Sequence, residues 1–390
     1  MADLGERRMC LDMPRIGIVA GEASGDLYGA KLAYVLKLKL PCLELEGIGS
    51  RQMREAGVNL LEDASQWGAM GITESLKVAP RIYSVLKRLE RRWLASPPDL
   101  LICIDFGAFN VPLCKWAKAK GIKTLYYMPP GAWRKTKQGS DLPKIADRIA
   151  TPFDWSFEML KQMGGEVEWV GHPLLDFACP TIEKKEFFSR HEIAEDATLV
   201  GFFPGSRLHE LNHHLPVLAR VAELLEQRGH SALYLAALAP TISSEVAEQI
   251  WKRHTLLPIR FISGQNYEIM AYSRALVMSS GTATLEAAIQ GTPMVVIYRG
   301  SFLMNIEYRI RKPKFDYISL PNILAEAPLA PELIQEAATP KRIADELIPL
   351  LGESSCRCKQ IQGFENVRAR LGSKGATERT AEIAVQLLKS

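Results

Sequence analysis

Short apolar runs alternate with longer segments of helical periodicity along nearly the whole chain. Such alternation is typical of βαβ units on a parallel sheet. In the first half we expect strands at Arg15–Ala20, Cys42–Gly47, Leu100–Asp105 and Ile122–Met128, and helices such as Asp26–Lys37 and Pro112–Lys120. The series then begins again, with strands at Leu199–Phe203, Ala232–Ala237, Ile259–Ile262, Ala275–Ser279 and Met294–Tyr298 and helices at Leu215–Arg228 and Ala283–Gln290. The pattern therefore predicts an α/β protein with two Rossmann-like, doubly wound parallel-sheet domains.

The two series are separated near residues 172–197, where His172-Pro173 and Cys179-Pro180 bracket a linker before a charged stretch. We expect a loose arm at 1–14, an N-terminal domain at 15–176, a C-terminal domain at 177–365 and a helical tail at 366–390. A length of 390 residues suits two such cores. Loops at the carboxyl ends of both sheets would then line a cleft between the domains, where open α/β sheets bind ligands.

Composition and charge exclude several classes of protein. With 47% hydrophobic and 24% charged residues, the chain is neither disordered nor fibrous. A net charge of +4 is nearly balanced, so we expect no nucleic-acid partner. The seven scattered cysteines favour a reducing cytoplasm. No apolar run approaches the roughly 18 residues needed to span a bilayer, so an integral membrane protein is not expected.

A glycine-containing loop follows the strand expected at Leu199–Phe203. Its residues are Pro204, Gly205, Ser206 and Arg207, and a helical pattern comes next. The small residues would let backbone N–H groups approach a ligand, and the helix N-terminus adds its positive dipole end. Arg207 can bind phosphate oxygens with both arms of its guanidinium group. The alternative is an ordinary turn with a surface arginine.

A second loop of this kind follows the strand expected at Ala275–Ser279. It consists of Ser280, Gly281, Thr282 and Ala283, and Glu286 comes about one turn into the next helix. Hydroxyls and amides at a helix start suit a diphosphate, and a carboxylate there can accept from ribose hydroxyls. The alternative is that the hydroxyls only cap the helix. Two such loops in one domain favour a nucleotide-diphosphate site.

In the first half, the turn Gly21-Glu22-Ala23-Ser24-Gly25-Asp26 follows the first strand. It lacks the G-x-G-x-x-G fingerprint of dinucleotide-binding enzymes, and no cofactor is expected. Glu22 and Asp26 would repel a pyrophosphate, so we expect this turn to face sugar hydroxyls. Asp105 ends the strongly apolar strand Leu100–Ile104, where a partly desolvated carboxylate can act as a general base. The alternative is that Asp105 only caps the following turn.

One stretch matches a metal-binding motif in its residues but not in its surroundings. His209-Glu210-Leu211-Asn212-His213 matches H-E-x-x-H, and His214 adds a third imidazole. A zinc enzyme needs such histidines on an interior helix face with a further ligand downstream. Because the match begins just after the first glycine loop among polar neighbours, we expect no metal. His209 and Glu210 would lie near the ligand, and His213 and His214 would be exposed.

Two stretches combine apolar and basic residues as membrane-surface helices do. In Pro80–Trp93 the apolar positions fall on one helical face and arginines and lysines occupy much of the rest. Phe302–Lys314 mixes aromatic and aliphatic residues with four basic ones. The alternative for both is a core-facing helix with a solvated basic back.

Taken together, the motifs resemble those of the lipid-A-disaccharide synthases, a family of GT-B glycosyltransferases. The matching segments, in chain order, are Ala20–Asp26, Gly47–Gly49 with Met53, Met70–Ile72 with Glu74, Ile104-Asp105 with Phe109-Asn110, Gly171–Leu174 with Asp176, Pro204–Arg207 with Glu210, Ser280–Ala283 with Leu285-Glu286, and Tyr317 with Ser319–Asn322. Each is weak alone, but their order and spacing are highly specific.

The resemblance implies a reaction. The family joins UDP-2,3-diacylglucosamine to 2,3-diacylglucosamine 1-phosphate, with inversion and without a required metal, giving a β-1,6-linked disaccharide and UDP. Asp105 would be the catalytic base. The UDP-sugar side would use Gly205, Ser206, Arg207, Glu210, Ser280, Gly281, Thr282, Ala283, Glu286 and Asn322, and the acceptor side Glu22, Ser24, Asp26, Met70 and Trp133.

The resemblance also implies partners and a location. Because its substrates carry acyl chains, a cytoplasmic enzyme of this family would lie peripherally on the inner membrane. The family forms homodimers through its C-terminal domains, so a homodimer is implied here.

This chain departs from the family pattern at two places. Gly107 replaces the usual Pro, and Ala108 stands where the family has Asp. The family segment Ser-Pro-Ser-x-Trp-Ala-Trp is here Pro129-Pro130-Gly131-Ala132-Trp133-Arg134-Lys135. Both departures lie on the acceptor side. The alternatives are therefore a related UDP-sugar transferase with another acceptor and a non-catalytic UDP-sugar-binding protein.

Overall fold

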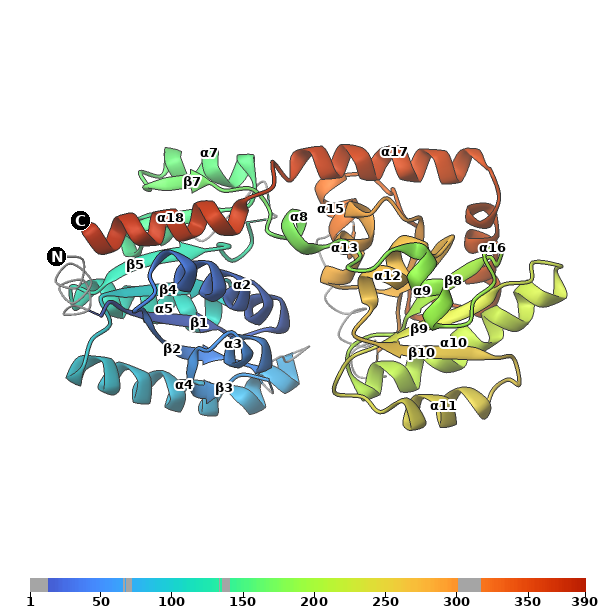
Figure 1. Cartoon of the computed structure of the whole chain (residues 1–390), viewed down its shortest axis with the longest axis horizontal. Helices are drawn as coiled ribbons and strands as arrows, with labels where there is room; N and C mark the ends of the chain where they lie inside the picture. Colours follow the sequence, from blue (N-terminus) through green and yellow to red (C-terminus); the bar gives the residue numbers. More distant parts are fainter. Residues whose placement is uncertain (1–12, 66, 68–71, 133, 135–140, 301–316) are drawn as a thin grey trace, which may run out of the picture. The chain divides into compact units, whose positions relative to one another are not determined.

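The computed structural model describes residues 13–65, 67, 72–132, 134, 141–300 and 317–390. The arm expected at 1–14 falls outside this range except for its last two residues. The chain forms two compact units (Figure 1). Unit 1 consists of Met1–Asp176 and Leu371–Ser390, and unit 2 of Phe177–Arg370.

Unit 1 contains a seven-stranded, wholly parallel sheet in the order β3-β2-β1-β4-β5-β6-β7. Its strands are β1 (Arg15–Ala20), β2 (Glu44–Gly49), β3 (Asn59–Asp63), β4 (Leu100–Ile104), β5 (Lys123–Tyr127), β6 (Arg148–Thr151) and β7 (Val167–Trp169). The central strand β4 is buried at every position, as expected of a parallel strand covered on both faces.

Helices cover both faces of this sheet (Figure 1). On one face lie α4 (Ile72–Ala95) and α5 (Gly107–Ala119), and on the other α2 (Ala23–Lys39) and the C-terminal α18 (Ala376–Lys389). The shorter helices are α3 (Arg51–Glu55), α6 (Leu142–Ile145), α7 (Asp154–Gln162) and α8 (Leu174–Phe177). Unit 1 is thus a doubly wound Rossmann-like domain, as the sequence predicted.

Unit 2 repeats the plan with a six-stranded parallel sheet in the order β10-β9-β8-β11-β12-β13. Its strands are β8 (Leu199–Phe203), β9 (Leu233–Leu238), β10 (Ile259–Ser263), β11 (Ala275–Ser279), β12 (Met294–Tyr298) and β13 (Glu332–Ile334). Alternate residues of β8 enter opposite cores, Val200 and Phe202 one and Leu199 and Phe203 the other.

The two faces of this second sheet are also covered. One face carries α10 (Leu208–Gln227), α11 (Ser244–Lys252) and α16 (Pro340–Leu351). The other carries α9 (Lys184–Arg190), α12 (Asn266–Tyr272), α13 (Thr282–Ile289) and α17 (Ser355–Arg370). Among the described residues, the remaining elements are α15 (Leu320–Ala325) and the short 3-10 helix η1 (Gln335–Ala337).

Each sheet has a switch point, where the helices that follow two neighbouring strands pack on opposite faces of the sheet. In unit 1 it lies between β1 and β4, and in unit 2 between β8 and β11. Open α/β sheets bind ligands at the carboxyl edge beside such a point. Most of the predicted site residues lie in the loops that follow these four strands or in the first turns of the next helices, whereas Met70, Trp133 and Asn322 belong to other segments.

The domain limits are less simple than the sequence indicated. The stretch expected as a linker contains α9, whose Phe187 and Phe188 are buried in unit 2. The expected helical tail is divided between the units, because α17 belongs to unit 2 and α18 to unit 1. There the Nζ of Lys123 donates to the carbonyl of Leu387 at 2.8 Å.

No helix among the described residues is long and apolar enough to cross a bilayer.

Candidate active site

Asp105 leaves the sheet at the switch point of unit 1, directly after β4. Ala20 of β1 and Ile104 of β4 are partners in register, so Gly21 and Asp105 leave the sheet side by side. Gly21 has no room for a side chain, because an added Cβ would lie 2.1 Å from the ring of Phe106. The turn after β4 is therefore closely packed against the turn after β1.

The backbone of this turn is held in an unusual conformation. Asp105 and Phe106 both have left-handed φ angles, +46° and +44°, which L-residues adopt at a cost. The side-chain amide of the buried Asn110 donates to the carbonyls of Val19 and Asp105 at 3.1 and 3.0 Å. The hydroxyl of Tyr126 donates to the same Asp105 carbonyl at 2.8 Å. Two side chains thus fix the direction in which Asp105 leaves β4.

The carboxyl group of Asp105 is electrostatically suited to accept a proton near neutrality. Burial, and after it the negative charge of Glu22, raises the pKa of Asp105 to about 7. A hydrogen bond from the Phe106 N–H opposes this rise. A general base works best when its pKa lies near the working pH.

The predicted acceptor-side residues near this turn have different environments. Glu22 is exposed and Ser24 half-buried at the start of α2, so both can meet a ligand. Met70 and Trp133 lie outside the described residues. A cluster of three aromatic side chains packs behind this turn. The ring centroid of Trp67 lies 6.0 Å from that of Phe106 and 5.3 Å from that of Phe109.

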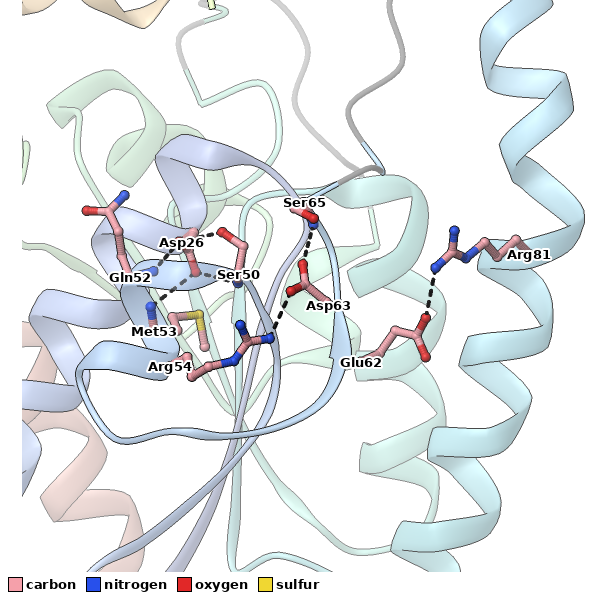
Figure 2. A network of polar contacts seen from close by, with 9 residues as sticks. All are labelled: Asp26, Ser50, Gln52, Met53, Arg54, Glu62, Asp63, Ser65 and Arg81. Atoms are coloured by element: carbon pink, nitrogen blue, oxygen red, sulfur yellow. Dashed lines mark hydrogen bonds and ion pairs between the residues drawn. The ribbon is translucent and has the colours of Figure 1, made fainter. Parts of the chain in front are cut away.

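The structure argues against a substrate role for Asp26. Its side chain is only 3% exposed and its carboxylate accepts from Ser50 N and Oγ, both at 2.6 Å, from Gln52 N at 3.0 Å and from Met53 N at 3.3 Å (Figure 2). These donors belong to the start of α3. Asp26 therefore caps α3, which the sequence did not reveal because the donors lie well over twenty positions away.

In unit 2 a carboxylate of the protein itself binds the backbone amides of the loop after β8. The carboxylate of Glu210 accepts from Ser206 N at 2.7 Å and from Arg207 N at 3.2 Å. Gly205 has a φ of +115°, and an added Cβ would lie 2.3 Å from a Glu210 oxygen. The amides expected to face a phosphate are thus occupied, and Glu210 shapes the loop instead of binding the nucleotide. Arg207 stands half-buried at the start of α10.

The loop after β11 lies beside it. Met278 of β11 is in register with Phe203 of β8, so both loops leave the sheet from neighbouring strand ends. Gly281 is exposed, and Thr282 begins α13, whose first N–H groups have no partner inside the helix. Ser280 is held by its Oγ, which donates to the carbonyl of Ile318 at 2.9 Å. This loop therefore leads into a helix N-terminus, the position at which proteins commonly bind anions.

Glu286 lies one turn into α13, where the sequence placed it. Burial raises the pKa of Glu286 to about 7, and a hydrogen bond from Tyr267 lowers it in part. The two oxygens of that bond are 3.4 Å apart. Glu286 is half-buried and can still accept from a ligand hydroxyl.

Asn322 does not fit its predicted place on the UDP-sugar side. It is 0% exposed, and its amide donates to Ala330 O and to a Glu332 carboxylate oxygen at 2.8 Å each. Its carbonyl oxygen accepts from Ala330 N at 2.9 Å. Glu332 also accepts from Ile318 N at 2.8 Å and from Ser319 N at 2.9 Å. The side chain of Asn322 thus anchors a connection and cannot reach a ligand.

The histidines of the H-E-x-x-H segment and the adjacent His214 do not form a metal site among the described residues. His214, expected to be exposed, is 0% exposed and bonded to two backbone groups, Pro204 O and Arg299 N. His209 and His213 are exposed. No group of three histidine, cysteine or acidic side chains placed to hold a metal occurs among the described residues.

The basic helix α4 is largely turned to the protein itself. From Arg81 onward, its apolar positions Val85, Leu86, Leu89 and Trp93 are buried in unit 1. Arg81 and Arg88 pair with Glu62 at 3.3 and 2.5 Å, and Arg92 pairs with Glu46 at 2.7 Å (Figure 2 shows Arg81). A membrane-binding face is therefore not what the stretch Pro80–Trp93 provides. The second stretch, Phe302–Lys314, lies outside the described residues.

Sequence reasoning missed four side chains that shape these sites. Asn110 and Tyr126 hold Asp105, Tyr267 contacts Glu286, and Glu332 organises the connection after 317. Asn110 gave a signal, because it belongs to one of the matching family segments, but its partners could be seen only in the fold.

Comparison with known proteins agrees with the motif pattern. A sequence model described as lipid-A-disaccharide synthetase matches residues 16–386. The lipid-A-disaccharide synthase of Syntrophus aciditrophicus is 37% identical over 379 residues, covering 95% of this chain and 97% of that protein. The enzyme of the same name from Nitrosococcus oceani is 37% identical over 383 residues, covering 96% and 97%.

Solved structures resemble the fold. The S. aureus MnaA–UDP structure has a TM-score of 0.64 at 12% identity, covering 97% of this chain and 98% of that one. Acinetobacter baumannii MurG has a TM-score of 0.55 at 13% identity, covering 96% and 99%. At such identities the likeness concerns the fold alone, which is the GT-B fold of two Rossmann-like domains.

Proposed function

The chain belongs to the lipid-A-disaccharide synthase family, and on that premise we propose that it joins UDP-2,3-diacylglucosamine to 2,3-diacylglucosamine 1-phosphate with inversion at the anomeric carbon. Membership makes it a glycosyltransferase of lipid A disaccharide synthesis. What is proposed here is the identity of the two substrates, the stereochemistry and the residues that act.

In this proposal, Asp105 of unit 1 is the general base. Its carboxylate accepts the proton of the acceptor 6-hydroxyl while that oxygen attacks the anomeric carbon of the donor. The bond from that carbon to the UDP oxygen breaks, so one displacement gives the β-1,6 linkage and UDP. The observation that carries this assignment is the position of Asp105, held in a strained turn at the switch point with a pKa raised to about 7.

The donor nucleotide is assigned to unit 2. Arg207 and the N-terminus of α13 would offset the negative charge that grows on the leaving diphosphate. Glu286 would accept hydrogen bonds from the ribose hydroxyls. Gly205 and Glu210 would act indirectly, by fixing the loop that presents Arg207.

Contact with the inner membrane is proposed from the substrates, which carry acyl chains. We also propose a homodimer formed through unit 2, which the family resemblance implies.

The direct test is a reaction with the two acylated sugars and the purified full chain. We expect a disaccharide 1-phosphate by mass spectrometry, a β linkage by NMR and one UDP per product. Absence of product from protein that binds UDP would contradict the proposed acceptor.

Another acceptor is the second candidate, and one contact favours it. An added Cβ at Gly107 would lie 2.8 Å from Pro130, so the two segments that depart from the family pattern touch each other beside Asp105. Changed packing at this place can alter which hydroxyl is presented to the base. A screen of acylated and unacylated amino sugars for acceptor-dependent UDP release separates the two candidates.

A further inference from the structure

Two buried side chains of α10 hold the loop that follows β8. Glu210 and His214 stand four positions apart and lie on one face of the helix. The carboxylate of Glu210 takes the amides of Ser206 and Arg207, and the Nδ1 of His214 donates to the carbonyl of Pro204 at 2.6 Å. Their side chains are 5% and 0% exposed. The loop that presents Arg207 is thus fixed from a single helix face.

His214 also contacts a second loop. The backbone N–H of Arg299 donates to its Nε2 at 2.9 Å. Since a carbonyl only accepts and an N–H only donates, the imidazole is neutral, with its proton on Nδ1. Burial lowers the pKa of His214, which favours the same neutral form. The next amide, Gly300 N, is held by the side chain of Gln335 at 3.2 Å.

The two contacts of His214 lie on opposite sides of β11. In the sheet, β8 and β12 flank β11, so their ends are separated by two strand spacings, about 9–10 Å. A link from Pro204 to Arg299 therefore passes the end of β11, where the loop 280–283 begins. One imidazole thus joins the loops that follow β8 and β12, on either side of the strand that leads into the loop 280–283.

We propose that His214 is a positioning residue for nucleoside diphosphate binding: it joins the loops after β8 and β12 and so holds Arg207 and the loop 280–283 in register with one ligand. This inference rests on the proposed nucleotide site of unit 2. His214 touches no substrate and acts through Pro204 and Arg299. Its effect is therefore on donor affinity, and the chemistry of the transfer is left to other groups.

Four variants of the full chain separate its two contacts. His214→Leu removes both. In His214→Asn the amide nitrogen can replace Nδ1 and keep the bond to Pro204, whereas the longer side chain of His214→Gln can reach Arg299 with its oxygen. His213→Asn changes the exposed neighbour and is the matched control. UDP affinity is measured by calorimetry well below each thermal midpoint, with donor KM and kcat.

The expected result is a graded loss. His214→Leu should weaken UDP binding and raise donor KM by about tenfold or more, because misplaced binding groups lose much of their effect. The Asn and Gln variants should fall between it and the wild type, kcat at saturating donor should change less than threefold, and His213→Asn should bind like the wild type.

Two results would overturn the inference. One is UDP binding by His214→Leu within twofold of the wild type while only its thermal midpoint falls, which makes His214 purely structural. If the leucine variant does not fold, the same outcome in both the Asn and Gln variants decides against it. The other is a wild type that binds no UDP, which overturns the proposed function together with this inference.

Discussion

At the scale of single residues, the turn after β4 is strained where the base is placed. Left-handed conformations at Asp105 and Phe106 cost roughly 1–2 kcal/mol each. The side chains of Asn110 and Tyr126 offset this cost by bonding to the Asp105 carbonyl. Such strain persists where the surroundings determine it, often at functional sites.

Asn110→Ala should lower both stability and activity. It removes the side-chain donor shared by the carbonyls of Val19, Ile104 and Asp105, of which Asp105 keeps the hydroxyl of Tyr126. The cost is about 2–4 kcal/mol in the free energy of unfolding. Because Asp105 is then less firmly aimed, kcat should fall more than donor KM rises. Urea unfolding and steady-state kinetics measure both. Tyr126→Phe is the milder comparison, since it removes one donor to Asp105.

The pH dependence of the reaction follows from the pKa of Asp105, which lies at about 7. Only the ionised carboxylate can accept a proton, so kcat should fall tenfold per pH unit once the pH drops below that value. Glu286 has a pKa of about 7 as well, and UDP affinity should weaken over the same range. Measuring kcat at saturating donor separates the two effects. A kcat that stays level down to pH 5 would count against Asp105 as the base.

At the scale of elements, Asp26 links α2 to α3. Its carboxylate accepts from Ser50, Gln52 and Met53 and replaces the missing bonds of the first turn of α3.

Asp26→Ala should therefore destabilise the protein by about 2–3 kcal/mol while leaving acceptor KM within about twofold, since its carboxylate faces the protein. Thermal unfolding and acceptor titration check this, with Glu55→Ala, an exposed residue of α3, as the control. A large rise in acceptor KM without loss of stability would restore the sugar-binding role that the sequence suggested.

The sequence predicted the long elements well because their apolar runs are strong. β1, β8, β11 and β12 have the expected bounds. β3, β6, β7 and β13 were missed, since they contain only three to five residues and carry charged or polar positions. Their strand conformation comes from pairing with a neighbour and not from their own pattern.

Some predicted site residues lie at the sheet edges where the sequence placed them, whereas others have a structural role in place of the predicted binding role. Asp105, Arg207, Gly281 and Glu286 lie at the carboxyl edges of their sheets, as the strand–loop order required. For Asp26, Glu210 and Asn322 a motif match could not show that a polar side chain already has backbone partners. Which hydrogen-bond partners a buried polar group has depends on the fold, so it cannot be predicted from a motif alone.

At the scale of the whole chain, the C-terminal segment returns to unit 1. The buried side chains Ile383, Ala384 and Leu387 of α18 face that unit, and Gly375 N donates to Asp176 at 2.6 Å. The last residues are thus part of the domain that carries the proposed base.

Deleting residues 371–390 should destabilise unit 1 selectively. Loss of the buried face of α18 removes about 5 kcal/mol of apolar burial or more and should lower the midpoint of one of two calorimetric transitions by roughly 10 °C or more. Removing only Lys389 and Ser390, which are exposed, is the control. A single transition that shifts as a whole would mean that the two units unfold together.

The central claim is that Asp105 is the base of a lipid A disaccharide transferase, and the wild type and Asp105→Asn, compared in one assay, test it most directly. Disaccharide formation is followed by mass spectrometry and UDP affinity by calorimetry. The account predicts that the wild type makes the disaccharide and that Asp105→Asn loses about 10²–10⁴-fold in kcat with UDP affinity within about twofold, since Asp105 belongs to the other unit. If Asp105→Asn keeps more than about a tenth of wild-type kcat, the loss is smaller than the removal of a general base causes. That result would contradict the account.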